Sequence, residues 1–289
     1  MNNKLKYAIA AAPLLLSAAS VAATGQLKHD MNLSTPGTEK VLHLPEAAAH
    51  SRVISLGSAV DSQSGEVVEG YAVIHRRGNN VKPDHAVKPP KPPKDDAASS
   101  CYSYMARGAM WKTVEPWYVN PTNPYGLTSE YVLANLVADV DKWEDAADGT
   151  MGDGAGADIL GGGASTIVTL VADMSAPDGL NEVYFGDIEG SGVIAVTVVW
   201  GVFGGPPKAR QLMEWDMVFE QVDFAWSATG EEGMMDFENI ATHELGHSIG
   251  LGHPDSTCVE ETMYAYADYG ETMKRDLNAG DIAGTDGLY

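Results

Sequence analysis

Histidine is scarce in this chain, and it is unevenly distributed. Of the eight histidines, only three fall within residues 99–289, and all three lie in the stretch HELGHSIGLGH, residues 243–253. A segment that uses histidine nowhere else is poorly explained by surface or core histidines gathered by chance. The scarcity of histidine elsewhere therefore makes this stretch the first candidate for a metal-binding or catalytic site.

Positive charge is also scarce in the second part of the chain. Residues 99–289 hold 7 Lys+Arg against 31 Asp+Glu, a net charge of −24, whereas residues 1–98 hold 11 against 9, a net charge of +2. A surface this acidic repels nucleic acid and anionic membranes, which argues against both as partners. It suits salty surroundings, cationic substrates or bound calcium, and composition does not choose among them. All six tryptophans also lie in the acidic part, which is therefore the better candidate for a folded domain.

Cysteine occurs only twice, as Cys101 and Cys258. In an exported chain an even pair favours a disulfide, which here would close a loop containing most of the acidic part. The alternative is that Cys101 is a free thiolate that caps a metal in an inactive precursor.

Long apolar runs are absent except near the N-terminus. Lys4 and Lys6 precede the run YAIAAAPLLLSAASVAA, which contains Pro13 and ends in small residues. This pattern predicts a signal peptide over residues 1–23, cut after Ala23. The alternative, a membrane anchor, is disfavoured because a spanning helix needs about 20 strongly apolar residues. We therefore expect a secreted chain, extracellular or periplasmic, with no membrane span once mature.

Two apolar runs and a proline-rich stretch organise residues 24–98. VISLGSAV and EVVEGYAVIH flank the turn sequence DSQSG, which predicts a β-hairpin. The prolines of residues 81–96 favour an extended linker, placed where the charge balance changes. We therefore expect a boundary near residue 98, between an N-terminal segment, residues 24–98, and a domain over residues 99–289.

Periodicity within residues 99–289 predicts an α+β domain. A strand is expected in WKTVEPWYVNP, and a helix capped by Thr128 or Ser129 should follow it. Residues 148–163 are rich in glycine and predict a loop, while residues 193–200 and 210–224 predict strands. The apolar stripe of the expected helix consists of Val132, Leu136, Val140 and Trp143.

The histidine-rich stretch predicts a metal-binding helix followed by a tight turn. Asp236 is a plausible N-cap for a helix that starts at Phe237. His243 and His247 are four residues apart, so on a helix both rings share one face and can bind one zinc ion. Glu244 lies beside the first histidine and can reach a water on the metal without binding the metal itself.

The glycines after this helix have a geometric role in the motif. Gly250 can adopt the left-handed conformation that ends a helix, and Gly252 allows a tight return of the chain. This return would bring His253 back to complete a set of three histidines, which a continuing helix would carry away.

HExxHxxGxxH followed by a methionine turn resembles the metzincin metallopeptidases, and among them the matrixins, in particular their prokaryotic secreted members. The resemblance extends over residues 99–289 and includes the helix ending in Trp143, TMY, and the C-terminal GDIAGTDGLY. It implies a twisted mixed β-sheet, a zinc-binding active-site helix and a small C-terminal subdomain. It also implies that Met263 is the methionine-turn residue beneath the zinc ligands, although Met273 is a rival.

The sequence departs from the matrixin pattern at several positions. Pro254 stands where matrixins commonly have serine, and residues 265–276 are longer and more polar than expected. The cysteine-containing inhibitory motif of animal matrix metalloproteases is absent, because residues 24–98 contain no cysteine. A propeptide role for residues 24–98 is therefore a hypothesis that rests on position alone.

Calcium is a second candidate ligand for the acidic domain. Several residues in glycine-containing loops offer the hard oxygen ligands that calcium prefers, but their spacing matches no EF-hand, and a solvated acidic loop is the simpler interpretation. They are Asp153, Asp158, Asp178 and Asn181.

The motif and the resemblance together predict a zinc-dependent endopeptidase, acting as a monomer on polypeptides. His243, His247 and His253 would bind Zn²⁺, and Glu244 would act as general base. By resemblance, an extended substrate would pair with an exposed sheet edge at residues 193–200. The alternative is a secreted zinc- or calcium-binding surface or adhesion module without catalysis. Glu244 argues against that alternative, since a structural zinc site needs no such carboxylate.

Overall fold

The computed structural model describes residues 41–45, 48, 51–78 and 101–289. These residues all fall in one unit, which spans Leu33–Tyr289. The predicted signal peptide, the proline-rich linker and the boundary near residue 98 lie outside the described residues. Among those described, no helix combines the length and apolar character needed to cross a membrane.

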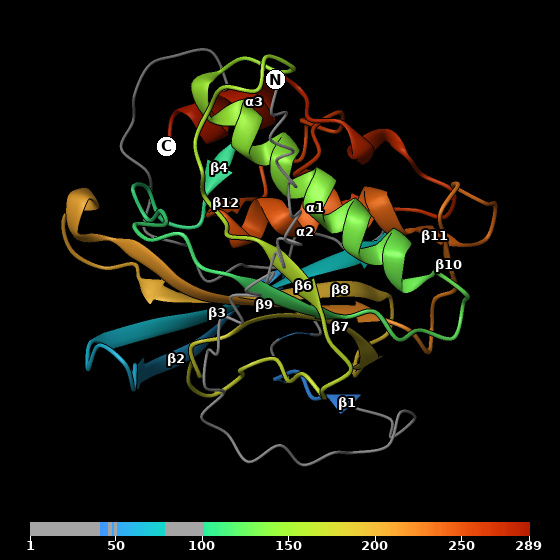
Figure 1. Ribbon diagram of the computed structural model, residues 1–289, viewed down its shortest axis with the longest axis horizontal. Coiled ribbons are helices and arrows are strands. Elements are labelled where there is room, and N and C mark those ends of the chain that lie inside the picture. Colours follow the sequence, from blue (N-terminus) through green and yellow to red (C-terminus); the bar gives the residue numbers. More distant parts are fainter. Residues whose placement is uncertain (1–40, 46–47, 49–50, 79–100) are drawn as a thin grey trace, which may run out of the picture. The chain divides into compact units, whose positions relative to one another are not determined.

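A mixed β-sheet of nine strands forms the centre of the described chain (Figure 1). Its main path is β13-β3-β8-β9-β7-β5-β6, with β1 paired to β7 and β2 paired to β3. The strands are β1 (Val41–Leu42), β2 (Val53–Val60), β3 (Val67–Arg77), β5 (Trp117–Asn120), β6 (Gly163–Ser165), β7 (Asn181–Ile188), β8 (Val193–Val202), β9 (Gln211–Glu220) and β13 (Tyr266–Ala267). Two small pairs lie apart from it: β10 (Trp226–Ser227) with β11 (Met235–Asp236), and β4 (Ser103–Tyr104) with β12 (Leu251–Gly252).

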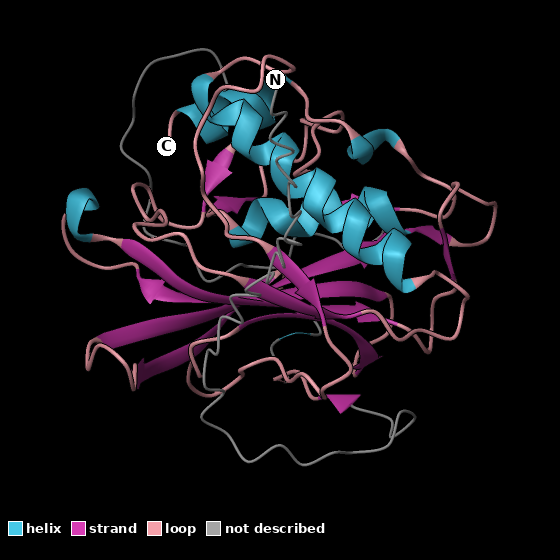
Figure 2. Cartoon of the chain, viewed as in Figure 1, coloured by secondary structure: helices cyan, strands magenta, loops and turns pink. Residues whose placement is uncertain are grey.

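Three α-helices accompany the sheet, and α1 and α2 cover one of its faces (Figures 1 and 2). They are α1 (Ser129–Asp145), α2 (Phe237–Ser248) and α3 (Ala279–Asp286), and the described residues also contain the short 3₁₀ turns Ala146–Asp148, Pro207–Ala209 and Met273–Arg275. The Thr128 side chain caps α1 by accepting a hydrogen bond from the Tyr131 N–H. The predicted apolar stripe of α1 is buried along its whole length. A mixed sheet with helices on one face confirms the predicted α+β class.

Two apolar clusters hold the sheet in place. The larger joins α1 and α2 to one face of the sheet and contains Trp143, Trp215 and Leu245. The smaller lies on the other face and contains Ile74, Val196 and Trp200. β8 contributes to both clusters, because its nearly uninterrupted apolar sequence allows burial on both faces.

The structure corrects the expectation that residues 193–200 form an exposed sheet edge. The predicted hairpin is present as β2 and β3, and β3 pairs antiparallel with β8 from Glu69 to Arg76. On its other side β3 pairs first with β2 and then, at Arg76 and Arg77, with the parallel strand β13. The edge of β8 is therefore covered by a strand from the N-terminal segment.

Candidate metal centre

Helix α2 begins at the predicted N-cap and is buried nearly throughout. The Asp236 carboxylate accepts a hydrogen bond of 3.0 Å from the Asn239 N–H and a second contact of 2.8 Å from the Arg275 Nε. Gly246 lies against Met263, and a Cβ at this position would come within 2.2 Å of the Met263 sulfur. A side chain at Gly246 would therefore displace the Met263 and Trp143 side chains that pack against α2.

The turn after α2 returns the chain as the glycine pattern predicts. Gly250 has a φ of 103°, a left-handed conformation that glycine adopts without strain. The next two residues form β12 and pair with β4, which fixes the path leading to His253.

The three motif histidines converge through their Nε2 atoms. The Nε2–Nε2 distances are 3.1 Å between His243 and His247, 3.1 Å between His247 and His253, and 3.3 Å between His243 and His253. A tetrahedral zinc ion with Zn–N bonds of about 2.0–2.1 Å holds its nitrogen ligands about 3.3 Å apart. The three histidines therefore fit the ligand geometry of one zinc ion.

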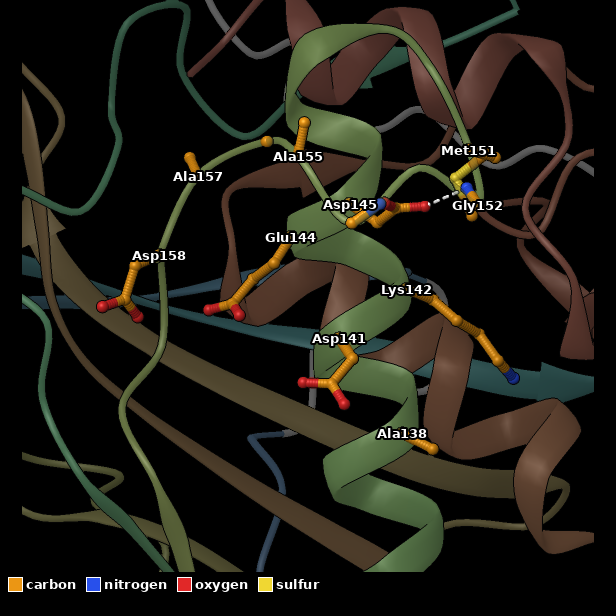
Figure 3. Close-up of a pocket in the computed structure, with 12 residues that line it drawn as sticks. Ala138, Asp141, Lys142, Glu144, Asp145, Met151, Gly152, Ala155, Ala157 and Asp158 are labelled. Carbon is orange, nitrogen blue, oxygen red and sulfur yellow. Dashed lines mark hydrogen bonds between the residues drawn. The ribbon is translucent and has the colours of Figure 1, made fainter.

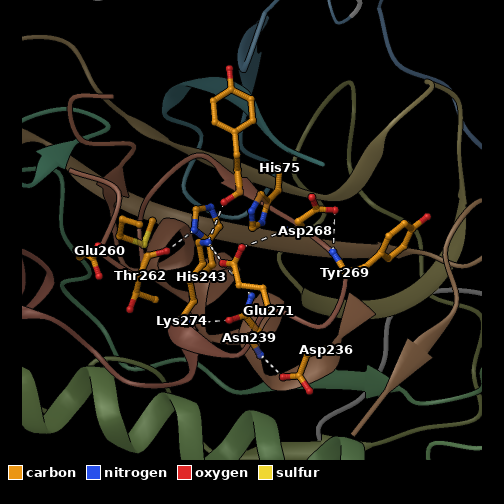
Figure 4. Close-up of polar contacts among 12 residues, drawn as sticks. His75, Asp236, Asn239, His243, Glu260, Thr262, Asp268, Tyr269, Glu271 and Lys274 are labelled. Carbon is orange, nitrogen blue, oxygen red and sulfur yellow. Dashed lines mark hydrogen bonds and ion pairs between the residues drawn. The ribbon is translucent and has the colours of Figure 1, made fainter. Parts of the chain in front are cut away.

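Backbone carbonyls orient two of these rings. The Nδ1 of His243 donates to the Thr262 carbonyl at 2.6 Å (Figure 4). The Nδ1 of His247 donates to the Leu251 carbonyl at 2.9 Å. With its proton on Nδ1, each ring presents an unprotonated Nε2 to the centre of the cluster. The donor set is thus already in the form that a metal requires.

A carboxylate holds the segment that orients His243. Asp281, at the start of α3, accepts hydrogen bonds from the Thr262 N–H at 2.7 Å and the Met263 N–H at 3.1 Å. It also accepts one from the Asn278 N–H at 2.9 Å, so it ties the helix start to the Thr262–Met263 turn. The position of the Thr262 carbonyl therefore depends on Asp281.

Burial keeps the histidine rings neutral. Burial, assisted by neighbouring histidines, lowers the pKa of His243 and of His253 well below the ordinary value. Burial also lowers the pKa of His247. Three neutral imidazoles whose lone pairs meet at one point repel one another, and a cation at that point relieves the repulsion.

Glu244 lies beside the histidine cluster and is fully buried. One carboxylate oxygen accepts a 2.6 Å hydrogen bond from the Thr197 hydroxyl of β8, and the other lies 3.0 Å from the Nδ1 of His75. Burial raises the pKa of Glu244 to about 7. A carboxyl group with this pKa can both accept and return a proton near neutral pH.

Comparison with known proteins finds a family that resembles the part of the chain containing this site. Residues 205–289 match the matrixin family of M10 peptidases. Residues 205–289 are matrixin-like. A 60-residue stretch is 42% identical to Matrilysin of Rattus norvegicus, covering 21% of this chain and 22% of that protein. A 59-residue stretch is 41% identical to Metalloendoproteinase 1-MMP of Arabidopsis thaliana, covering 20% of this chain and 15% of that protein.

These matches confirm the predicted resemblance to the matrixins, and that resemblance supports zinc dependence. They span less than a quarter of the length of either relative. The activity, substrates and partners of the whole chain are therefore matters for proposal.

His75 of β3 also lies at the matrixin-like site, and the sequence did not single it out, just as it did not single out Thr197 or Asp281. The His75 ring lies 3.9 Å from the His243 ring, measured between centroids, and its side chain is fully buried (Figure 4). Burial lowers the pKa of His75 to about 3, so the ring is neutral. The only available signal for His75 was a polar residue ending the apolar run EVVEGYAVIH, and the charge change near residue 98 suggested a separate segment.

Met263 and the two cysteines also lie near the matrixin-like motif. Met263 is buried beneath α2, whereas its rival Met273 is 44% exposed. Cys101 and Cys258 form a disulfide, which joins the start of the described C-terminal part to the segment between His253 and Met263.

The four candidate calcium ligands are used in local hydrogen bonds or lie apart from any metal-ligand group in the described part of the chain. The Asn181 amide is used in the fold, because its oxygen accepts from the Trp215 N–H and its nitrogen donates to the Pro116 carbonyl. Asp153 and Asp178 each accept from a backbone N–H two residues along the chain. None of the three aspartates belongs to a metal-ligand group of His, Cys, Asp or Glu side chains among the described residues.

The fourth of these residues, Asp158, lies at a surface hollow of about 890 Å³ beside α1 (Figure 3). The Asp145 carboxylate in the hollow accepts from the Gly152 and Gly154 N–H groups. Glu144 accepts from the Ile159 and Leu160 N–H groups at 2.8 and 2.9 Å. These carboxylates therefore hold the glycine-rich loop against α1.

A different set of carboxylates does gather. Ligand atoms of Asp173, Glu214 and Asp216 lie within 4.8 Å of one another. Burial raises the pKa of Glu214 to about 9 and raises that of Asp216 well above its ordinary value. This group was not predictable from local sequence spacing, because Asp173 is far in sequence from the pair on β9.

Proposed function

We propose that this chain is a secreted zinc-dependent endopeptidase that hydrolyses polypeptides, with one zinc ion bound by His243, His247 and His253. The observation that carries the proposal is the convergence of three neutral Nε2 atoms at 3.1–3.3 Å next to a buried carboxylate. When bound, zinc would polarise the scissile carbonyl and make water more acidic.

Glu244 is the proposed general base. It would take the proton from the attacking water and later deliver that proton to the amine that leaves. The Thr197 hydroxyl donates to one of its oxygens at 2.6 Å, which fixes the carboxylate relative to β8. Thr197 is thus a positioning residue, since it acts through Glu244.

The remaining assignments follow from the sequence. Residues 1–23 would be removed on export, and residues 24–98 would form a segment distinct from a peptidase domain over residues 99–289. Met263 would support the zinc ligands from below, and the mature chain would act as a monomer. Sequencing the N-terminus of the exported protein tests the first of these assignments.

The test of the proposed function combines metal content with hydrolysis. A denatured protein substrate is given to the intact chain and to the chain cut within residues 79–100. The cut chain is included because β3 occupies the edge of β8, where an extended substrate was expected to pair. We expect cleavage that is lost with a chelator and restored by zinc.

Glu244→Gln is the deciding variant, because it keeps the volume of the side chain and removes the base. We expect it to keep one bound zinc and to lose about 10²–10⁴-fold in rate, the usual contribution of general base catalysis. Full activity in this variant would refute the assignment of Glu244. One bound zinc without hydrolysis in any form of the chain would favour a non-catalytic binding module.

A further inference from the structure

Strand β3 occupies the space along β8 next to the histidine cluster. It pairs antiparallel with β8 on one side, and on the other side Arg76 and Arg77 pair with the parallel strand β13. Two backbone hydrogen bonds close this arrangement, from the Arg77 N–H to the Gly192 carbonyl and from the Gly78 N–H to the Ala267 carbonyl, both 2.9 Å. The backbone groups that an added peptide strand would use are therefore already taken.

The side chains of β3 fasten it to both sides of this space. The Arg76 guanidinium donates to the Ser191 carbonyl at 3.1 Å. The Arg77 guanidinium lies 4.4 Å from the centre of the Tyr269 ring and 3.5 Å from the Asp268 carboxylate. The N-terminal segment thus supplies two positive charges to an acidic domain.

His75 places an imidazole on the proposed general base. Its Nδ1 donates to Glu244 at 3.0 Å, and its ring lies against His243 with a centroid distance of 3.9 Å. The His75 Nε2 is buried and has no hydrogen-bond partner among the described residues. A buried polar atom without a partner destabilises a fold, so packing alone is a poor explanation for His75.

We propose that the β2–β3 hairpin is an internal inhibitor of the peptidase site, acting by strand pairing with β8 and by the contact of His75 with Glu244. The inference rests on the proposed function, because it concerns the regulation of that site. It identifies a histidine, in a segment without cysteine, as the group that blocks the site. A substrate carbonyl needs the space next to Glu244 that the His75 ring fills.

The test uses the zinc-loaded full chain with a specific protease site placed within residues 79–100. Rates on a fluorogenic peptide are measured before and after the cut, in the unaltered background and with His75→Leu. Leucine approximates the volume of histidine without its hydrogen bond, and His75→Gln is a second variant that guards against misfolding. Val67→Ala is the matched control, because Val67 lies on the same strand and is 66% exposed.

The expected result is a slow uncut chain whose kcat/KM rises about tenfold or more with His75→Leu, the effect of losing one hydrogen bond to a charged group. Cutting the chain and removing the hairpin fragment should raise kcat/KM further. The kcat/KM of Val67→Ala should equal that of the unaltered chain. Equal rates for the uncut chain, the cut chain and His75→Leu would overturn inhibition. His75→Leu weakens the hold of the hairpin in the uncut chain, so it also decides the case in which the cut fragment stays bound.

A second readout is independent of activity. Amide hydrogen exchange of residues 193–199 should be slow in the uncut chain and faster in His75→Leu and after the cut. Unchanged exchange in both would contradict a releasable strand. If every form of the chain binds one zinc and none hydrolyses peptide, the proposed function itself fails.

Discussion

Among the described residues, the three motif histidines and a separate carboxylate group each bring metal-ligand side chains together in largely buried surroundings, and the two groups differ in how they are neutralised. The histidine group, His243, His247 and His253, lies on and after α2, whose apolar side chains belong to the cluster on the helical face. The carboxylate group contains Asp216, which alternates along β9 with Met217 of that cluster and so points to the other face.

The two groups differ in whether their ligand atoms carry protons. Two of the histidines commit their Nδ1 protons to carbonyls, so their converging nitrogens carry none, and burial keeps the rings neutral. In the carboxylate group, burial raises the pKa of Asp216 well above its ordinary value and that of Glu214 to about 9, so Glu214 retains a proton at neutral pH. A cluster of potential metal ligands therefore needs a bound cation only where protons do not already neutralise its ligand atoms.

The largest effect is expected from removing one ligand of the histidine group. His247→Ala should weaken zinc binding by far more than the 10- to 100-fold typical of losing an outer hydrogen-bond partner. Metal analysis after dialysis against a zinc buffer measures this. Glu214→Gln, made in the carboxylate group, is the control and should retain zinc. Equal zinc content in the two variants would contradict the claim that the histidine group, and not the carboxylate group, binds zinc.

A smaller effect is expected from Asp281→Asn, which acts on the histidine group through the Thr262 carbonyl. One oxygen of the side chain becomes an NH₂ that faces backbone N–H groups, so the Thr262–Met263 segment should shift. We expect zinc affinity to fall about tenfold, the lower end for an outer-shell change. A competitive zinc chelator titration measures it. Asp286→Asn, exposed on the same helix, is the control, and equal affinities would contradict the proposed positioning role.

The carboxylate group should reveal itself in the pH dependence of stability. Glu214 has a pKa raised to about 9, so the folded chain keeps a proton that the unfolded chain releases near 4.5. The free energy of unfolding should therefore fall as pH rises from about 5 towards 9. Glu214→Gln should flatten this slope by at most about 1.4 kcal/mol per pH unit, the value for one proton.

Urea unfolding at pH 6 and pH 8.5 measures this slope, with equal amounts of zinc in all samples. Asp216 still titrates in the variant, so some slope should remain. A slope as steep as in the unaltered chain would show that Glu214 carries no such proton.

The smallest effect is expected from Met263→Leu. The two side chains have similar volumes, and a swap of this kind in a core usually costs less than about 1.5 kcal/mol. Zinc affinity should change by no more than a few-fold, because the residue supports the ligands by packing alone. Thermal unfolding measures the change in stability, and zinc titration measures the change in zinc affinity. Met273→Leu is the exposed control, and a loss of zinc in Met263→Leu alone would assign the sulfur a larger role.

Local spacing was enough to predict much of the site. The helix after Asp236, the left-handed Gly250 and the return to His253 all depend on residues within about twenty positions of one another. Short-range geometry is set by backbone preferences that each residue carries with it. The cap at Thr128 and the buried stripe of α1 were predictable for the same reason.

The contacts that were missed join residues far apart in sequence. His75 and Glu244 are 169 positions apart, and they meet only because β3 pairs with β8. The hairpin itself was predictable from two apolar runs that flank a turn sequence, but its partner strand is selected by register and by the two apolar clusters. The charge difference on either side of residue 98 pointed to a separate segment, and charge does not decide which strands pair.

The most direct test of the metal centre is X-ray absorption spectroscopy of the full chain with one equivalent of zinc. The expected result is a zinc ion with three nitrogen ligands at about 2.0–2.1 Å and no sulfur ligand. A shell made of oxygen ligands alone, or a spectrum that does not change with His247→Ala, would contradict zinc binding by His243, His247 and His253.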